Sequence, residues 1–296
     1  MRRKGLWRRV LYIALAVVGL YLGACWALAG KYLQPTRYVA ELPHWMREAQ
    51  WGGQTCFVSP RLAEKKTVPV VFVLAHGLGG NRSSFTETAR TLDGAGYGVI
   101  LPPMAGQDVS TEDRIGFGVE ESDLLAKIVG EARALPGHPK VIVGGVSMGG
   151  AAAWLTTAKV PVDGVITESA YAEADRAAED FLNSRIKGGS IFLRPVVIFG
   201  GWRSGIALKE IRPVDAARGY RGPSVVIHAG NDGLFARAHA EELAEAARTK
   251  PIYFDGVGHA HGRELEPERY DGFFLDLARR VLTPLGPPRN DHALDP

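Results

Sequence analysis

Cysteine is scarce in this chain, and nothing in the sequence suggests a bound metal or cofactor. Two cysteines occur among 296 residues. Cys25 lies in an apolar run and Cys56 in the body of the chain, so we expect neither a disulfide framework nor a thiolate metal site. His138 and His228 lack the spacing of metal ligands. We therefore look for chemistry that side chains can perform without a cofactor.

An excess of positive charge is also missing once the first nine residues are set aside. The formal net charge is +3. Five basic residues lie in the first nine, which contain no acid: Arg2, Arg3, Lys4, Arg8 and Arg9. The rest of the chain carries 30 basic and 32 acidic side chains. Basicity confined to one end argues against a nucleic-acid partner and favours a membrane-facing N-terminus.

The longest stretch without a charged side chain is residues 10–30. Its 21 residues can cross a hydrocarbon core of about 30 Å at a rise of about 1.5 Å per residue. Aromatic residues near its two ends are typical of membrane interfaces: Trp7, Tyr12, Trp26 and Tyr32. We therefore expect a cytoplasmic N-terminus at 1–9, a transmembrane anchor at 10–30, and the rest of the chain on the outer side.

A cleaved secretory signal is the alternative interpretation of this segment. Residues 27–29 (Ala-Leu-Ala) resemble a small-x-small processing site. After the apolar run, Pro35 and Pro43 interrupt any continuous helix, so we predict a juxtamembrane tether at 31–51.

The sequence around Ser147 is the strongest indication of chemistry. A β-branched run at 141–143 leads into a G-x-S-x-G motif at Gly145–Gly149, and a helix-forming run follows at 151–158. A strand, a sharp turn and a helix in this order form a nucleophile elbow, in which glycines on both sides leave room for a strained serine. We therefore predict that Ser147 is a catalytic nucleophile.

A second glycine-rich stretch, His-Gly-Leu-Gly-Gly at 76–80, follows an apolar strand predicted at 68–75. In a nucleophile-elbow enzyme, the main-chain N–H groups of Leu78 and Met148 would form the oxyanion hole. A phosphate-binding loop is the competing interpretation, but no Lys-Ser/Thr pair follows and the spacing does not fit a dinucleotide fingerprint. We expect His76 to orient the loop.

Predicted strands and helices alternate along the chain, which is typical of a mostly parallel central sheet flanked by helices. We expect this α/β domain to cover 52–282, with a flexible tail at 283–296. Over fifty residues separate two of the predicted strands, far more than one crossover helix needs, so we predict an inserted helical cap at about 170–213. Its apolar run at 191–202 either packs the cap onto the domain or forms an acyl pocket or membrane-facing lid.

Six motifs follow one another along residues 68–282. They are His76–Gly80, Gly116–Asp123, Gly145–Gly149, Arg212–Asp215, His228–Asp232 and Gly256–His259. In this order they resemble the α/β-hydrolase superfamily, and within it the membrane-associated abhydrolase and BEM46-like serine hydrolases, which are similar to prolyl-oligopeptidase-type peptidases. Residues 106–110 depart from the Gly-His-Gly-x-Ser turn that is usual in the family.

The resemblance implies a triad in the order serine, acid, histidine, with the acid after a late strand and the histidine after the last one. Asp232 lies just beyond one such predicted strand, and His259 lies beyond the other. Asp232 would orient the His259 ring, and His259 would take the proton from Ser147 and return it to the leaving group. Asp255 and His261 are the nearby competitors for these two roles.

Together these features predict a membrane-anchored serine hydrolase. It would cleave an ester or thioester of a small-molecule or lipid-like acyl substrate, through an acyl-enzyme and without a cofactor. A serine peptidase of the same fold is one alternative, although the sequence contains no recognisable propeller or acidic pocket for a substrate amine. A non-catalytic membrane-bound binding protein is the other, and the intact set of Ser147, Asp232 and His259 argues against it.

Overall fold

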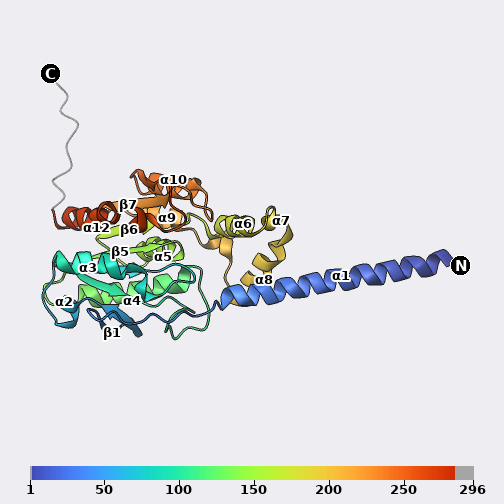
Figure 1. Cartoon of the computed structure of the whole chain (residues 1–296), viewed down its shortest axis with the longest axis horizontal. Helices are drawn as coiled ribbons and strands as arrows, with labels where there is room; N and C mark the ends of the chain where they lie inside the picture. Colours follow the sequence, from blue (N-terminus) through green and yellow to red (C-terminus); the bar gives the residue numbers. More distant parts are fainter. Residues whose placement is uncertain (1, 284–296) are drawn as a thin grey trace, which may run out of the picture.

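The computed structural model describes residues 2–283 and contains an eight-stranded sheet flanked by helices (Figure 1). The strand order is β1-β2-β4-β3-β5-β6-β7-β8. Strands β3 to β8 are parallel, while β1 and β2 are antiparallel additions at one edge. The strands are β1 Arg47–Trp51, β2 Gln54–Val58, β3 Val70–Ala75, β4 Gly98–Leu101, β5 Lys140–Val146, β6 Gly164–Glu168, β7 Ser224–Ala229 and β8 Pro251–Phe254. The predicted α/β fold with a mostly parallel sheet is confirmed.

Helices cover both faces of the sheet. Buried side chains of α3 and α12 pack on one face, and those of α4, α5, α9 and α10 pack on the other. The α-helices are α1 Arg2–Leu33, α2 Pro60–Ala63, α3 Thr86–Gly94, α4 Val119–Arg133, α5 Met148–Thr157, α6 Ala174–Arg185, α7 Gly189–Phe192, α8 Arg194–Ser204, α9 Pro213–Gly219, α10 Arg237–Ala246, α11 Gly262–Leu265 and α12 Pro267–Leu282. Two short 3-10 helices are η1 Arg82–Phe85 and η2 Leu208–Glu210.

Strand β3 shows why the centre of the sheet is apolar at every position. Val71 and Val73 pack into the core beneath α4 and α5, whereas Val70, Phe72 and Leu74 pack into the core beneath α3 and α12. Successive side chains of a strand point to opposite faces, so a strand that is covered on both sides has no solvent-facing position. The strand is thereby fixed at the centre, and the loop after it is held at the carboxyl edge of the sheet.

The structure differs from expectation at residues 47–51, which we expected in the tether and which form the edge strand β1. This strand pairs with β2 as a hairpin. Gly52 and Gly53 connect the two strands with φ values of +59° and +81°. A two-residue hairpin turn of this kind requires positive φ at both positions, which glycine adopts without strain. The Gly-Gly pair is therefore the sequence signal that indicates the hairpin.

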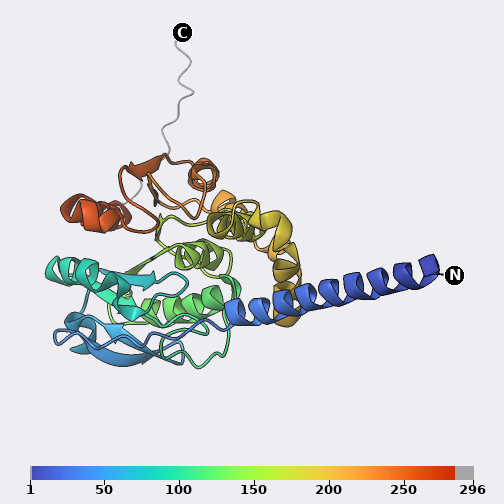
Figure 2. The same cartoon turned by 45° about the vertical axis from the view of Figure 1, so that its right-hand side comes forward.

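A helical insertion lies between β6 and β7. It consists of α6, α7, α8, η2 and α9, and α9 returns to pack on the sheet. Figures 1 and 2 show α7 and α8 away from the sheet, with α8 beside α1. The apolar run predicted at 191–202 is divided between α7 and α8, since Pro195 lies in the first turn of α8. The tail predicted at 283–296 lies, apart from its first residue, outside the described residues.

Helix α1 projects from the domain as a single uninterrupted helix (Figure 1). An 18-residue window within residues 6–33 has a mean hydropathy of 2.1, and little of this window is buried. Such a helix is long and apolar enough to cross a membrane or to act as a signal sequence. Within residues 6–33, buried side chains occur in the C-terminal part, where Cys25, Ala29 and Leu33 pack against the rest of the protein.

Candidate active site

Ser147 lies at the tight turn between β5 and α5, with φ 53° and ψ −121°. This backbone conformation is strained for a residue with a side chain. The flanking glycines allow the turn to pack against β3. A Cβ on Gly149 would overlap the Ala75 carbonyl oxygen, and one on Gly145 would lie 2.5 Å from it. The main-chain N–H of Ser147 donates to the Glu168 carbonyl at 2.9 Å, which ties the turn to β6.

The two predicted oxyanion donors lie on either side of this turn. Leu78 and Met148 both border the cavity that contains Ser147. Within residues 2–283, neither main-chain N–H makes a hydrogen bond to another protein group. A main-chain N–H that has no protein acceptor can donate to water or to a ligand, so the two groups are available to an oxygen atom bound in the cavity.

His76 holds the glycine-rich loop in place. Its Nε2 accepts a hydrogen bond from the Met104 N–H at 3.1 Å, and therefore its Nδ1–H donates to the Gly77 carbonyl at 2.9 Å. Burial lowers the pKa of His76 to about 4. The ring is thus neutral at ordinary pH and is occupied on both nitrogens, which agrees with an orienting role.

The stretch at 106–110, which departs from the family motif, supports the same loop. The Gly79 N–H donates to Gln107 Oε1 at 2.5 Å. Asp108 accepts from Arg82 Nε at 2.8 Å and from the Arg82 main-chain N–H at 2.9 Å, and both side chains are buried. Sequence reasoning missed these contacts, because the partners lie more than 25 residues apart and no local pattern joins them.

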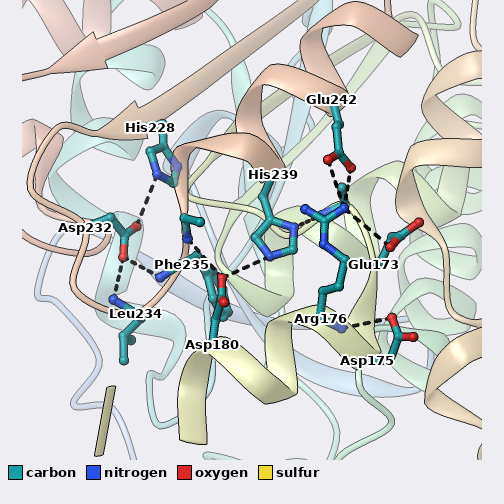
Figure 3. Close-up of polar contacts among 12 residues, drawn as sticks. Glu173, Asp175, Arg176, Asp180, His228, Asp232, Leu234, Phe235, His239 and Glu242 are labelled. Carbon is teal, nitrogen blue, oxygen red and sulfur yellow. Dashed lines mark hydrogen bonds and ion pairs between the residues drawn. The ribbon is translucent and has the colours of Figure 1, made fainter. Parts of the chain in front are cut away.

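Asp232 and His259 form a close pair. The His259 Nδ1 lies 2.8 Å from Asp232 Oδ2 and 3.0 Å from Oδ1. The N–H groups of Leu234 and Phe235 each donate to Asp232 Oδ1 at 2.9 Å (Figure 3). Burial acts to raise the pKa of Asp232, but the hydrogen bonds from His259 and the two N–H groups outweigh it and lower the pKa to about 2. Asp232 is therefore an ionised carboxylate throughout the neutral range.

The competing residues lie in different surroundings. The Asp255 side chain is 81% exposed and pairs with Arg237 at 3.3 Å. His261 borders the cavity, but its Nδ1 lies 2.7 Å from Glu264, and its side chain is 55% exposed. The structure therefore brings Asp232, and not Asp255, to the ring of His259, which borders the same cavity as Ser147.

Glu168 is a buried carboxylate that sequence reasoning passed over as the end of a strand. Its Oε1 accepts the Gly262 N–H at 2.8 Å, and its Oε2 accepts the Tyr270 hydroxyl at 2.9 Å. Burial raises the pKa of Glu168. Since the Glu168 carbonyl also holds the Ser147 N–H, one residue ties the turn at the serine to the chain just after His259. In the sequence, only its position at the carboxyl end of the predicted strand indicates that Glu168 lies near the site.

Polar contacts also tie the insertion to the loop that carries Asp232 (Figure 3). Asp180 on α6 accepts the Ala236 N–H at 3.0 Å and lies 3.4 Å from His239 Nε2. Arg176, one turn earlier on α6, pairs with Glu242 of α10 at 2.7 Å. These contacts fix the orientation of α6 relative to the start of α10, and thereby the wall that the insertion presents to the cavity.

The cavity measures about 770 Å³, a size that is common for small-molecule sites. Ser147, His259, Leu78 and Met148 all border it, and Asp232 lies behind the histidine ring. The insertion and the end of α1 contribute apolar side chains to its lining. A serine nucleophile, a histidine fixed by a carboxylate and two free N–H groups around one space are the parts that acyl transfer requires.

The lowered pKa of Asp232 predicts a pH dependence of stability. A carboxyl whose pKa falls from 3.8 to about 2 on folding stabilises the fold above pH 4, and this contribution is lost as the pH falls towards 2. We expect the difference in unfolding free energy between the wild type and Asp232→Asn to shrink below pH 4. Denaturant unfolding in detergent at pH 7, 5, 4 and 3 measures it, with Asp255→Asn as the matched control. A difference that stays constant down to pH 3 would contradict the pairing.

Comparison with known proteins agrees with this geometry. A family model for the alpha/beta hydrolase fold matches residues 70–218. Lipase 1 of Psychrobacter immobilis is 35% identical over 100 residues, which are 31% of this chain and 28% of that protein. The chain thus matches little more than a quarter of the length of that lipase.

Several solved structures share the fold. An esterase of Pyrococcus furiosus superimposes with a TM-score of 0.66 at 16% identity, over 84% of this chain and 98% of that one. A thermophilic esterase of Thermogutta terrifontis gives a TM-score of 0.56 at 16% identity, over 80% and 100% of the two chains. The family match covers half of the chain and includes the elbow at Ser147. This chain belongs to the alpha/beta hydrolase fold family.

Proposed function

We propose that this protein is a membrane-anchored serine hydrolase that cleaves acyl esters or thioesters. Within the family, the resemblance of its motifs to those of the membrane-associated abhydrolase and BEM46-like hydrolases supports this proposal. One observation carries the proposal. The strained Ser147 and the Asp232–His259 pair meet at a single cavity, and Asp232 is held ionised behind the histidine.

The reaction follows from this arrangement. His259 Nε2 takes the proton from Ser147 Oγ as the oxygen attacks the acyl carbonyl carbon. The Nδ1–H donates to Asp232, which fixes the tautomer and stabilises the imidazolium that forms. The tetrahedral intermediate then collapses, and its C–O or C–S bond breaks. The alcohol or thiol leaves with the proton from Nε2, and the acyl group remains on the serine.

Hydrolysis of the acyl-enzyme repeats the same steps with water as the nucleophile. In both halves of the reaction, negative charge develops on the carbonyl oxygen. The N–H groups of Leu78 and Met148 would stabilise this charge, and removing one such donor from an acyl-transfer enzyme typically costs about 3 kcal/mol of transition-state stabilisation. The His76 and Gln107 hydrogen bonds hold the first of these donors in position before substrate arrives.

The environment of the histidine ring supports the same mechanism. The Phe235 and His259 rings pack nearly perpendicular to each other, with 5.0 Å between centroids. This contact covers one face of the pair and keeps bulk water from it, which strengthens the interaction between the imidazolium and Asp232.

The N-terminal helix supports a membrane location for the active site. The helix over residues 6–33 contains a segment apolar enough to span a bilayer, and the basic cluster at 2–9 precedes the uncharged stretch at 10–30. By the positive-inside rule, the N-terminus is cytoplasmic and the hydrolase domain lies on the other side of the membrane. A cleaved secretory signal is the alternative, and it would release the same domain in soluble form.

We expect alanine at each triad position to remove most of the activity on p-nitrophenyl esters. Ser147→Ala, Asp232→Ala and His259→Ala should each lower kcat/KM by about 10³-fold or more, because the three side chains act as one unit. Asp255→Ala and His261→Ala are the matched controls, with losses below about tenfold expected. Circular dichroism checks that each variant is folded. A large loss in the two controls, together with a small loss at Asp232 and His259, would reverse the assignment.

Acyl chain length provides a second test. Burial of each CH₂ group is worth roughly 0.8 kcal/mol, so kcat/KM should rise along a series of esters from C2 until the apolar part of the cavity is full. We expect an optimum beyond the shortest esters for the detergent-solubilised full-length protein, and weaker turnover of aminoacyl amides. If rates fall steadily from C2 onward, the substrate is a small ester. If amides outrun all esters, the protein is a peptidase.

A further inference from the structure

The active-site cavity has a wall that comes from the N-terminal helix. Ala29, Tyr32 and Leu33 of α1 border the same cavity as Ser147 and His259. Ala29 is 1% exposed and Leu33 is 4% exposed, although most of α1 is open to its surroundings. A helix that served only as a tether would have no reason to bury side chains in the catalytic cavity.

Several contacts hold the last turns of α1 in this position. The Ile115 N–H donates to the Leu33 carbonyl at 3.0 Å, and Leu33 shares a buried cluster with Met148, the residue after the nucleophile. Earlier in the helix, Ala29 packs with Val196 of α8. The end of α1 is therefore anchored both to the hydrolase domain and to the insertion.

Aromatic contacts reinforce the packing between α1 and α8. The Trp26 ring meets Phe199 edge-on, with 5.5 Å between centroids, and the Arg203 guanidinium stacks 4.8 Å above Trp26. Nearer the active site, the Tyr32 ring meets Phe181 of α6 edge-on at 5.4 Å. Contacts of this kind add to simple apolar burial, so the three helices form one packed unit.

The polarity of the cavity lining differs between the helices that contribute to it. The side chains that α1, α6 and α8 contribute are mostly apolar, Arg185 and the Tyr32 hydroxyl excepted, and include Ala29, Leu33, Phe181 and Val196. Charged and hydroxyl side chains come instead from α3 and α11, among them Glu87, Thr88, Arg263 and Glu264. Figures 1 and 2 both show α6 and α8 on the opposite side of the molecule from α3. An acyl chain would fit against the side chains of α1, α6 and α8, and a polar leaving group would fit against those of α3 and α11.

Large apolar side chains are exposed on α7 and α8, together with Arg194 and Arg203 of α8. Phe192, Ile198 and Trp202 are exposed there, and the Tyr21 hydroxyl donates to the Phe192 carbonyl. If α1 crosses a bilayer, helices in contact with Tyr21 and Trp26 lie at the level of the membrane boundary. The apolar side of the cavity is then next to the lipid, where acyl chains are concentrated.

We infer that the last turns of α1 form the wall of the acyl subsite and limit the length of the chain that it accepts. This inference rests on the proposed function, because it assigns the acyl side of the same site. It also makes α1 part of the working enzyme. Cleavage after Ala29 would remove one wall residue and leave Tyr32 and Leu33 at a free chain end, where helical order is lost.

One substitution that enlarges a side chain of α1 and one that shortens a side chain test whether α1 limits the acyl chain length. Ala29→Phe fills the subsite, and we expect the ratio of kcat/KM for the decanoyl ester to that for the butyryl ester to fall about tenfold, equivalent to losing about two buried CH₂ groups. Leu33→Ala enlarges the subsite and should move the optimum to longer chains. A misfolded protein would not shift the preference in opposite directions. Leu20→Phe, on the exposed part of α1, is the matched control and should leave the ratio unchanged.

A binding measurement tests the wall without hydrolysis. Fluorescent dodecanoic acid is titrated into detergent-solubilised Ser147→Ala protein, with and without Ala29→Phe. Weaker binding in the double variant supports the wall, even if the wild type proves to have no esterase activity, and that result would then count against the proposed function alone. An unchanged ester ratio together with unchanged fatty-acid binding would overturn the inference.

Discussion

The packing of two elbow glycines against the main chain of β3 is the constraint on which the rest of the site depends. No side chain fits between Gly145 or Gly149 and the Ala75 carbonyl, so β5 and β3 approach closely at their carboxyl ends. That approach forces Ser147 into a strained conformation above the sheet and places it beside the loop that follows Ala75. The same backbone contact therefore positions Ser147, the proposed nucleophile, and the loop that carries Leu78, a proposed oxyanion donor.

Local patterns were sufficient to predict the parts of the fold and site that depend on short-range geometry. The apolar strand before His76, the elbow at Ser147 and the alternation of strands and helices each leave a signature within ten or so residues, and the fold they predict is confirmed. The close Asp232–His259 contact fits the order of the predicted triad, whose catalytic roles stay a prediction.

Contacts between distant residues left no such signature. Glu168 holds the chain after His259 through Gly262, which lies 94 positions away. The Arg82–Asp108 pair and the wall formed by the end of α1 also require the folded chain before they can be recognised. Tertiary packing decides these contacts, and it links the N-terminal helix, the insertion and the catalytic loops into one structure around the cavity.

Labelling with a fluorophosphonate probe tests the central claim, that Ser147 is an activated nucleophile, most directly. The probe phosphonylates a serine only where a base removes its proton and donors stabilise the developing charge. Peptide mass spectrometry of the labelled, full-length protein in detergent should find one adduct, on Ser147, and none in Ser147→Ala. A folded wild-type protein that remains unlabelled would contradict the account and favour a non-catalytic binding protein built on this fold.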